Sequence, residues 1–313
     1  MADTTLISDL IVPELFNEYL IQETVKKNAF LSSGIASSDD SVKFDRGGKT
    51  VNIPFFERLT NGVEVLKDST AMTVHKITAN KDIAAIHARG VTYGASGLAK
   101  LFTGADPIKA ITSQLSDVWS EEMTAVIINT LKGIFGVTEM ADSLSDQSAK
   151  VLDAHMMSDS MYLLGDNYHK ITGLACHSRV LAKLKDLDLI DTVLPSEQGP
   201  GYSTYMEKRI VVDDSIEAEG GAYPIYFFGN GALAYNENSN LVTFETERNK
   251  FADIDYIISR RAFTMHPRGV KWQGTPADGE TPSNTELATA ANWALVENRK
   301  NVKIAKLLAK VSA

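Results

Sequence analysis

Two short glycine-containing motifs could bind phosphate or activate a serine, and each departs from the pattern that its chemistry needs. Gly48-Lys49-Thr50 is similar to the end of a phosphate-binding loop, but that loop requires a glycine where Lys43 stands. It also requires a helix next, which Pro54 opposes. Gly94-Ala95-Ser96-Gly97 lacks the Gly-x-Ser-x-Gly spacing of a nucleophile elbow. The sequence therefore predicts turns or joints here and no nucleotide site.

The side chains that bind metals or transfer protons are also poorly placed for chemistry. No two of the six histidines stand four residues apart, and a single cysteine, Cys176, excludes both an internal disulfide and a zinc site built from cysteines. Neighbouring residues on a strand point to opposite faces, so Cys176 and His177 are not expected to pair. The acid pairs Asp213-Asp214 and Glu121-Glu122 are more typical of solvated charges than of a catalytic dyad. We expect no catalytic residue, metal or cofactor, and hence no enzyme.

One group of basic residues stands out near the C-terminal end of the sequence. Arg299, Lys303, Lys306 and Lys310 follow one another at spacings of four, three and four, which would place them on one face of a helix. Such a face could be solvated or contact an acidic neighbouring subunit, or it could face the phosphates of nucleic acid. The spacing does not choose between these alternatives.

Alternating apolar residues predict a long β-hairpin between residues 49 and 90. Val51 and Ile53, Val63 and Val65, and Met72 and Val74 each follow the period of two that a strand requires, and Asn61-Gly62 is a strong hairpin-turn signal. The segment has too few large apolar residues for a core of its own. Because an isolated hairpin is marginal in water, we expect this arm to lie on another surface.

The clearest single element is a helix over residues 106–136. Asp106 is suited to the N-cap, Pro107 to the first helical position and Gly136 to the C-cap. Apolar residues recur at spacings of three and four between these ends. At 1.5 Å per residue the rod would be roughly 45 Å long. Gly90, Gly94, Gly97 and Gly104 fall between the hairpin and this helix, where we expect them to act as hinges for the arm.

The pattern of apolar residues in the second half of the chain predicts a unit of mixed helices and strands. Helices are expected at 149–164 and 178–187 and strands at 171–175, 209–213, 223–228, 232–236 and 241–246. A tight turn at Gly229-Asn230-Gly231 is expected to join two of these strands. A long strand should follow over 251–272, and a helical tail over 285–310.

Composition narrows the class of protein. The 313 residues are 44% hydrophobic and 23% charged, which is ordinary for a folded domain. A net charge of −9 argues against a sequence-reading DNA-binding protein, although it allows a container for DNA. No run of about 20 apolar residues suggests a membrane span, and the first ten residues lack the basic region of a secretory signal.

The order of elements resembles the major capsid proteins of tailed bacteriophages, whose fold encapsulin shells share. Four segments also resemble sequences of this family: residues 6–14, 208–214, 223–232 and 263–272. The resemblance implies an α+β chain with an N-terminal arm (1–45), an extended β-hairpin E-loop with its connection (46–105), a peripheral domain with a long spine helix (106–139 and 251–274), an axial α/β domain (140–250) and a C-terminal helical tail (275–313).

The same resemblance implies a structural role. Copies would assemble as pentamers and hexamers into an icosahedral head that encloses double-stranded DNA. The DNA would be contacted non-specifically, and no membrane would be involved. Assembly would take place in the host bacterial cytoplasm, with portal, scaffolding and decoration proteins as partners. An encapsulin-like compartment or another virion structural protein is the alternative. The sequence lacks the long N-terminal extension that serves some family members as a scaffold. Any scaffolding is therefore expected to come from a separate protein, or from a segment that has been removed.

Overall fold

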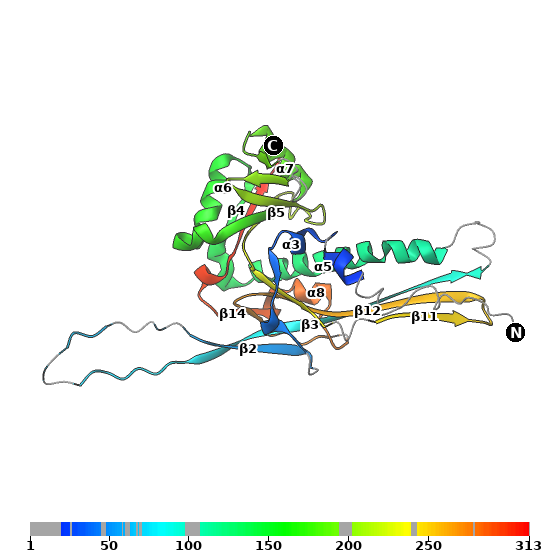
Figure 1. The fold of residues 1–313 in the computed structure, drawn as a ribbon. Helices are drawn as coiled ribbons and strands as arrows, with labels where there is room; N and C mark the ends of the chain where they lie inside the picture. Colours follow the sequence, from blue (N-terminus) through cyan, green and yellow to red (C-terminus); the bar gives the residue numbers. More distant parts are fainter. Residues whose placement is uncertain are drawn as a thin grey trace.

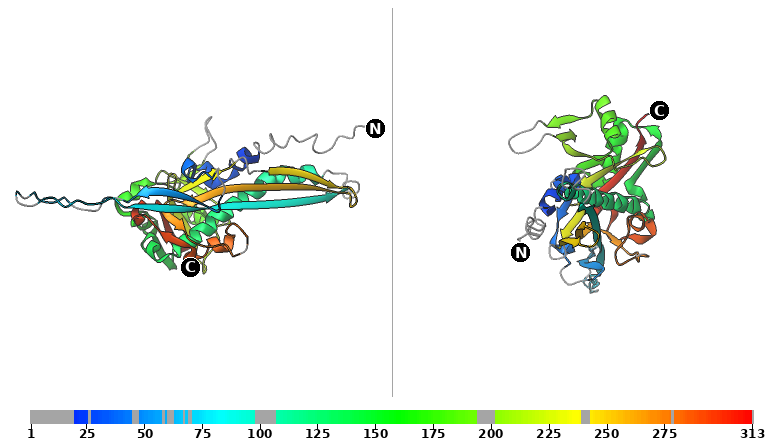
Figure 2. Two further views of the ribbon diagram at one scale, coloured as in Figure 1. Left: turned by 90° about the horizontal axis from the view of Figure 1, so that it is seen from below. Right: turned by 90° about the vertical axis from the view of Figure 1, so that its right-hand side faces the viewer.

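A single strand of 18 residues, β3 (Ala79–Ser96), joins the arm of the molecule to its body. The computed structural model describes residues 20–25, 27–44, 48–57, 59, 63–66, 68, 71–97, 107–193, 202–238, 243–277 and 279–312. The first part of β3 pairs with β2 (Thr50–Phe56) to form the hairpin arm. Its second part pairs with β12 (Ile254–Pro267) inside the body. The predicted hairpin is confirmed where residues 50–56 pair with residues 79–85, and it protrudes far from the body (Figures 1 and 2). Residues 63–66 and 71–78, which were also expected to be strands, form none, and the predicted turn at Asn61-Gly62 lies outside the described residues.

The body around β3 contains a six-stranded sheet in the order β1-β10-β12-β3-β2, with β11 also paired to β12. The remaining strands are β1 (Ala36–Ser38), β10 (Leu233–Glu237) and β11 (Thr243–Asn249). The short elements α3 (Ala29–Ser32) and η1 (Asp40–Val42) flank β1. The expected returning strand is thus confirmed as β12, but it ends at Pro267. A turn at Gly269, whose φ is +87°, separates it from β13 (Val270–Trp272).

The predicted long helix is present as α5 (Pro107–Phe135), packed against this sheet. Leu115 and Trp119 form one apolar cluster with Phe244 and Ile257, and the residues from Met123 onward belong to the main core. Gly133 permits close packing on the opposite side, because a Cβ there would lie 2.1 Å from the carbonyl oxygen of Leu287 in α8 (Asn284–Leu287). None of the helices that the structure describes is long and apolar enough to cross a membrane.

A second sheet of seven strands forms the rest of the molecule, in the order β4-β15-β9-β5-β8-β7-β6. Its strands are β4 (Leu144–Val151), β5 (Ile171–Cys176), β6 (Asp191–Val193), β7 (Tyr202–Tyr205), β8 (Lys208–Val212), β9 (Tyr223–Gly229) and β15 (Ile304–Lys310). The helices α6 (Ala154–Met161) and α7 (Ser178–Asp186) pack on one face, with η2 (Thr138–Ser143) and η3 (Tyr162–Lys170) beside them. Strands β5, β8 and β9 and helix α7 confirm the predicted elements.

Two sequence-based expectations are wrong. The helix expected at 149–164 begins only at Ala154, because residues 144–151 form strand β4 beside β15. The expected helical tail contains only the short helices α8 (Asn284–Leu287), η5 (Ala290–Asn292) and η6 (Arg299–Asn301), with strands β14 (Trp293–Leu295) and β15. The tight turn expected at Gly229-Asn230-Gly231 is confirmed between β9 and β10, although β9 lies in the seven-stranded sheet and β10 in the six-stranded one.

The misassigned tail has a physical explanation. Strand β15 lies between β4 and β9 with apolar side chains on both faces, so its sequence is a nearly continuous apolar run. Such a run cannot be distinguished from a buried helix by periodicity alone. The strand unites the two halves of the core: Ile304 packs in the cluster that includes α5, and Leu307 packs in the cluster under α6 and α7.

A buried ion pair fixes the junction between the arm-bearing sheet and α5. Arg261 on β12 is 1% exposed and donates to both carboxylate oxygens of Glu237, at 2.5 and 2.6 Å. It also donates to Thr24 Oγ1 at 2.9 Å and lies over the ring of Trp119. The hydroxyl of Tyr235 donates to the same carboxylate. Four segments far apart in the sequence therefore depend on one charged cluster.

Candidate functional site, an exposed hairpin arm

The outer part of the arm exposes apolar side chains that no described residue of the subunit covers. Beyond the pairing of Phe56 with Ala79, Val63 is 105% exposed and Val74 is 95% exposed. In all, eight large hydrophobic residues of the described part of the arm are exposed: Phe56, Leu59, Val63, Val65, Leu66, Met72, Val74 and Ile77. So many exposed apolar side chains on one arm are typical of a segment that binds another molecule.

The root of the arm is held firmly to the body. The Asp82 carboxylate on β3 accepts hydrogen bonds from the backbone N–H of Gly269 at 3.0 Å and of Ile83 at 2.9 Å. Its Oδ2 also lies 2.9 Å from His266 Nε2. Burial alone would raise the pKa of Asp82, but the neighbouring His266 and the two backbone donors lower it. The carboxylate therefore stays ionised and fastens the arm to the turn after β12.

A buried histidine beside this root makes the fold sensitive to acid. Burial lowers the pKa of His87 to about 3, and the charge of Arg89 acts in the same direction. Its ring packs against Phe263, with centroids 5.4 Å apart. The unfolded chain binds a proton on this residue near pH 6.5, so it holds more protons than the folded chain as the pH falls from 6.5 toward 3.

Because of His87, we expect the free energy of unfolding of the wild-type subunit to fall by about 2 kcal/mol when the pH is lowered from 8 to 5. In a His87→Gln variant, which cannot ionise, this part of the pH dependence should vanish. Urea unfolding of both proteins at the two pH values measures the difference. An identical loss of stability in both would show that His87 does not titrate in this way.

The four basic residues singled out in the sequence do not share a helical face, so that expectation is wrong. Arg299 lies in η6 and donates to the carbonyl oxygens of Asp142 and Leu163, both at 3.0 Å. Lys306 is buried in β15, where it pairs with Glu219 at 2.7 Å. Lys303 precedes β15 and Lys310 ends it, and neither forms an ion pair with a described residue. A contact of these residues with DNA or with a neighbouring subunit stays a prediction.

The proposed hinge glycines are placed differently from the connection expected for them. Gly90 and Gly94 lie within β3, paired with Arg260 and Tyr256 of β12. A Cβ on Gly94 would lie 3.1 Å from the ring of Tyr256, so close packing explains this glycine. Gly97 directly follows β3, and Gly104 falls in a part of the chain that the structure does not describe. Bending at Gly90 or Gly94 would require breaking the pairing with β12, and a hinge role stays a prediction.

Residues that could perform chemistry do not converge in the described part of the chain. His177, Ser178 and Asp214 lie close together, but Ser178 Oγ and Asp214 Oδ1 both face the same ring nitrogen, Nδ1, at 3.3 and 3.7 Å. That nitrogen already accepts the backbone N–H of Arg179, so no proton relay can form. Burial raises the pKa of Cys176 to about 12, and no group of His, Cys, Asp and Glu side chains among the described residues could hold a metal ion.

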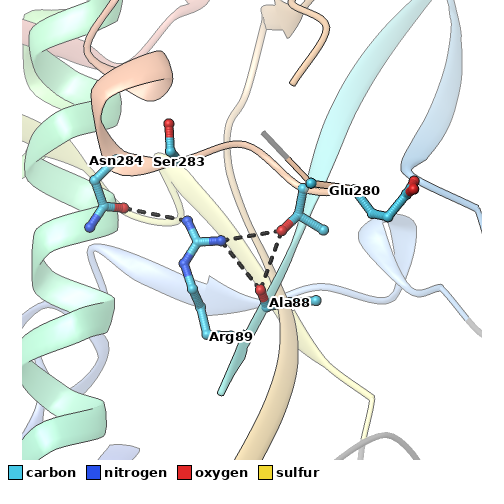
Figure 3. Close-up of a pocket in the computed structure, with 7 residues that line it drawn as sticks. Ala88, Arg89, Glu280, Ser283 and Asn284 are labelled. Carbon is cyan, nitrogen blue, oxygen red and sulfur yellow. Dashed lines mark hydrogen bonds between the residues drawn. The ribbon is translucent and has the colours of Figure 1, made fainter. Parts of the chain in front are cut away.

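The pocket shown in Figure 3 lies where three segments of the chain are held together by hydrogen bonds. It has a volume of about 520 Å³ and is lined by Ala88 and Arg89 of β3 and by residues 279–284. The Arg89 guanidinium donates to Glu122 of α5 at 3.0 Å and to the carbonyl oxygen of Pro282 at 2.6 Å. Further donation to the Ala88 carbonyl oxygen, Thr281 Oγ1 and Asn284 Oδ1 occupies its remaining N–H groups. Arg89 therefore ties β3, α5 and the C-terminal segment together and is not available to an anion.

Comparison with known proteins agrees with the architecture. In the solved capsid of cyanophage Pam1, the matching chain shares 13% sequence identity with a TM-score of 0.61, covering 92% of this chain and 93% of that one. The SrpI encapsulin of Synechococcus elongatus matches with 10% identity and a TM-score of 0.54, covering 89% and 86% of the two chains. These likenesses confirm the fold class that was expected from the order of elements.

Sequence comparison resolves the family. The major capsid protein of Bacillus phage SPP1 is 37% identical over 321 residues, covering 99% of both chains. The family model described as Major capsid protein 13-like (Gp13-like) matches residues 48–303, from the start of the arm to the start of β15. This chain therefore belongs to the Gp13-like major capsid protein family.

Proposed function

We propose that this chain is the subunit that builds a bacteriophage head, and that it works by binding copies of itself. The observation that carries the proposal is the arm, whose exposed apolar residues lie far from the body of their own subunit. An arm on one surface that binds a different surface of the next copy makes a heterologous contact, and such contacts close into rings. Pentamers and hexamers are the rings that an icosahedral head requires.

The proposal extends to the contents and the partners of the shell. The net charge of −9 suits a wall that encloses double-stranded DNA without binding it tightly. A portal and separate scaffolding proteins, with decoration proteins outside, would complete a head assembled in the host cytoplasm and retained in the virion. The close phage relative favours this function over an encapsulin-like compartment, although an encapsulin shares the fold.

Expression of the chain alone, followed by negative-stain electron microscopy and light scattering, tests the central part of the proposal. We expect closed shells or discrete pentamers and hexamers. A monomer that resists assembly even with crowding agents, and whose arm is protected from protease, would contradict it. Shells that hold a protein cargo in their native host, in place of nuclease-resistant DNA, would favour the compartment.

A further inference from the structure

Strand β3 changes its partner at the base of the arm. It pairs with β2 as far as Ala85 and with β12 from Ile86 onward, so the two ladders meet without overlapping. One hydrogen bond, from Ile86 N–H to Lys49 O, extends the β2 side past this exchange. A strand that is paired along one edge at a time is less stiff than a strand inside a sheet. The exchange between Ala85 and Ile86 is therefore the position at which the arm can bend relative to the body.

Two contacts on the inner side limit this bending. The Asp82 carboxylate accepts the backbone N–H of Gly269, and Val51 packs in a small apolar cluster with Val42 and Ala84. The hydrogen bond is directional, so it fixes one point of the arm, whereas apolar contacts let one side chain slide over another. The arm can therefore change direction about Asp82 unless its other edge is also held.

A loop of residues 279–282 holds the other edge. The carbonyl oxygen of Pro282 accepts a hydrogen bond from Arg89 of β3 at 2.6 Å. Glu280 forms an ion pair with Lys49, the residue that precedes β2. The loop therefore contacts both strands of the hairpin on either side of the exchange.

The two contacts of the loop differ in strength. The side chains of Lys49 and Glu280 are 62% and 78% exposed, so solvent and salt screen their attraction and it contributes little. The Arg89 side chain is 18% exposed and also donates to Glu122 of α5 at 3.0 Å. Charge-assisted hydrogen bonds from a shielded guanidinium are the stronger kind. Arg89 is therefore the residue that holds the loop, and it does so from a position fixed by α5.

The base of the loop is fixed independently of the arm. One carboxylate, that of Glu286, accepts the backbone N–H of Ala277 at 2.5 Å and that of Ser283 at 2.8 Å. The Ser283 side chain in turn caps α8, which completes a capping box. The loop should therefore keep its shape when its contacts with β3 are broken.

Space beside the loop allows it to shift. The pocket of about 520 Å³ in Figure 3 lies between the loop and β3, with Ala88, Glu280 and Thr281 among its lining residues. The Thr281 hydroxyl donates to the Ala88 carbonyl oxygen at 3.3 Å, a longer bond than that of Arg89. Residues 279–282 belong to neither main core cluster, so a shift into this space breaks hydrogen bonds without opening the core.

We propose that the loop of residues 279–282, held by Arg89, sets the direction of the arm, and that the arm bends between Ala85 and Ile86 when the loop shifts. The inference rests on the proposed self-assembly. Five-membered and six-membered rings present the next subunit at different angles, so arms of identical sequence need more than one direction. Arg89 is a positioning residue in this arrangement, and the glycines of β3 that pair with β12 need not bend.

A distance measurement between two nitroxides by double electron–electron resonance tests the proposal on the full chain, kept too dilute to assemble. The labels are attached at Glu57→Cys, at the end of the paired part of the arm, and at Glu121→Cys on α5. Both positions are exposed, and the native Cys176 is buried and should not react. We expect one narrow distance distribution, which Arg89→Met should widen at least about twofold.

Two further variants make the measurement specific. Arg260→Met is the matched control, because Arg260 forms an exposed ion pair with Glu245, and it should leave the width unchanged. Thr281→Val removes one hydroxyl of the loop and should give an intermediate width. Melting temperatures are recorded alongside, since a less stable but folded subunit keeps the direction of its arm. A wild-type width in both Arg89→Met and Thr281→Val would overturn the inference and leave the proposed function intact.

A covalent bridge tests whether assembly needs the loop to shift. Ala88→Cys with Glu280→Cys places two exposed thiols beside the pocket, where a short bis-maleimide can join them. The same variant capped with N-ethylmaleimide is the control. We expect bridging, verified by mass spectrometry, to lower the yield of closed heads at least about tenfold relative to the capped protein. Equal yields and equal head sizes would overturn the inference. A wild-type chain that forms no heads would instead refute the function itself.

Discussion

Replacing residues 58–77 by Asn-Gly will give a folded subunit that no longer assembles. Glu57 N–H donates to Thr78 O at 2.9 Å, so a two-residue turn can close the hairpin at that pair without changing its register. Both core clusters and the Asp82 attachment lie outside the deleted segment. Light scattering and electron microscopy should show only monomers, while the melting temperature stays within a few degrees of the wild-type subunit.

A milder pair of variants separates the length of the arm from its chemistry. Val63→Ser with Val74→Ser removes two fully exposed apolar side chains, whereas His75→Ser with Lys76→Ser changes two polar positions of the same arm. We expect the valine variant to raise the concentration needed for assembly by about tenfold or more, since each buried valine contributes about 1.5 kcal/mol or more, and the control to change it little. Normal shells from the shortened arm would refute the role given to the arm.

Arg261→Met will destabilise the subunit by about 3–5 kcal/mol, because it leaves the Glu237 carboxylate buried without its partner. The matched control lies next to it on the same strand. Arg260 pairs with Glu245 at 3.0 Å, but both side chains are more than half exposed, so Arg260→Met should cost no more than about 1 kcal/mol. Urea unfolding of the arm-shortened protein gives both values without interference from assembly.

A double variant tests the cause of this loss. The single variant leaves the Glu237 carboxylate buried without a partner. Arg261→Met combined with Glu237→Gln removes that charge, so the double variant should recover a large part of the lost stability. If Arg261→Met costs no more than Arg260→Met, the buried pair does not hold the junction of β10, β12, α5 and the segment around Thr24.

Elements that are regular, with one apolar and one polar face, could be predicted from the sequence. The hairpin arm followed from alternation at Val51 and Ile53, and the long helix from apolar residues at spacings of three and four between Pro107 and Gly136. The lack of a core in the arm was also readable, because apolar residues near Val63 and Val74 are few. Such elements carry their pattern locally, since one face meets solvent and the other meets protein.

Features that depend on contacts between residues distant in the sequence could not be predicted and are seen only in the tertiary structure. Strand β15 lies between β4 and β9 with both faces buried, so its sequence lacks the alternation of a half-exposed strand and was assigned to a helix. For the same reason Lys306 was expected on an exposed helical face, whereas it is buried and paired with Glu219. The change of sheet after Gly229 and the pairing of Arg261 with Glu237 each arise from contacts between separate segments. No local pattern specifies them, because the sequence of a strand does not name the distant segment that it pairs with.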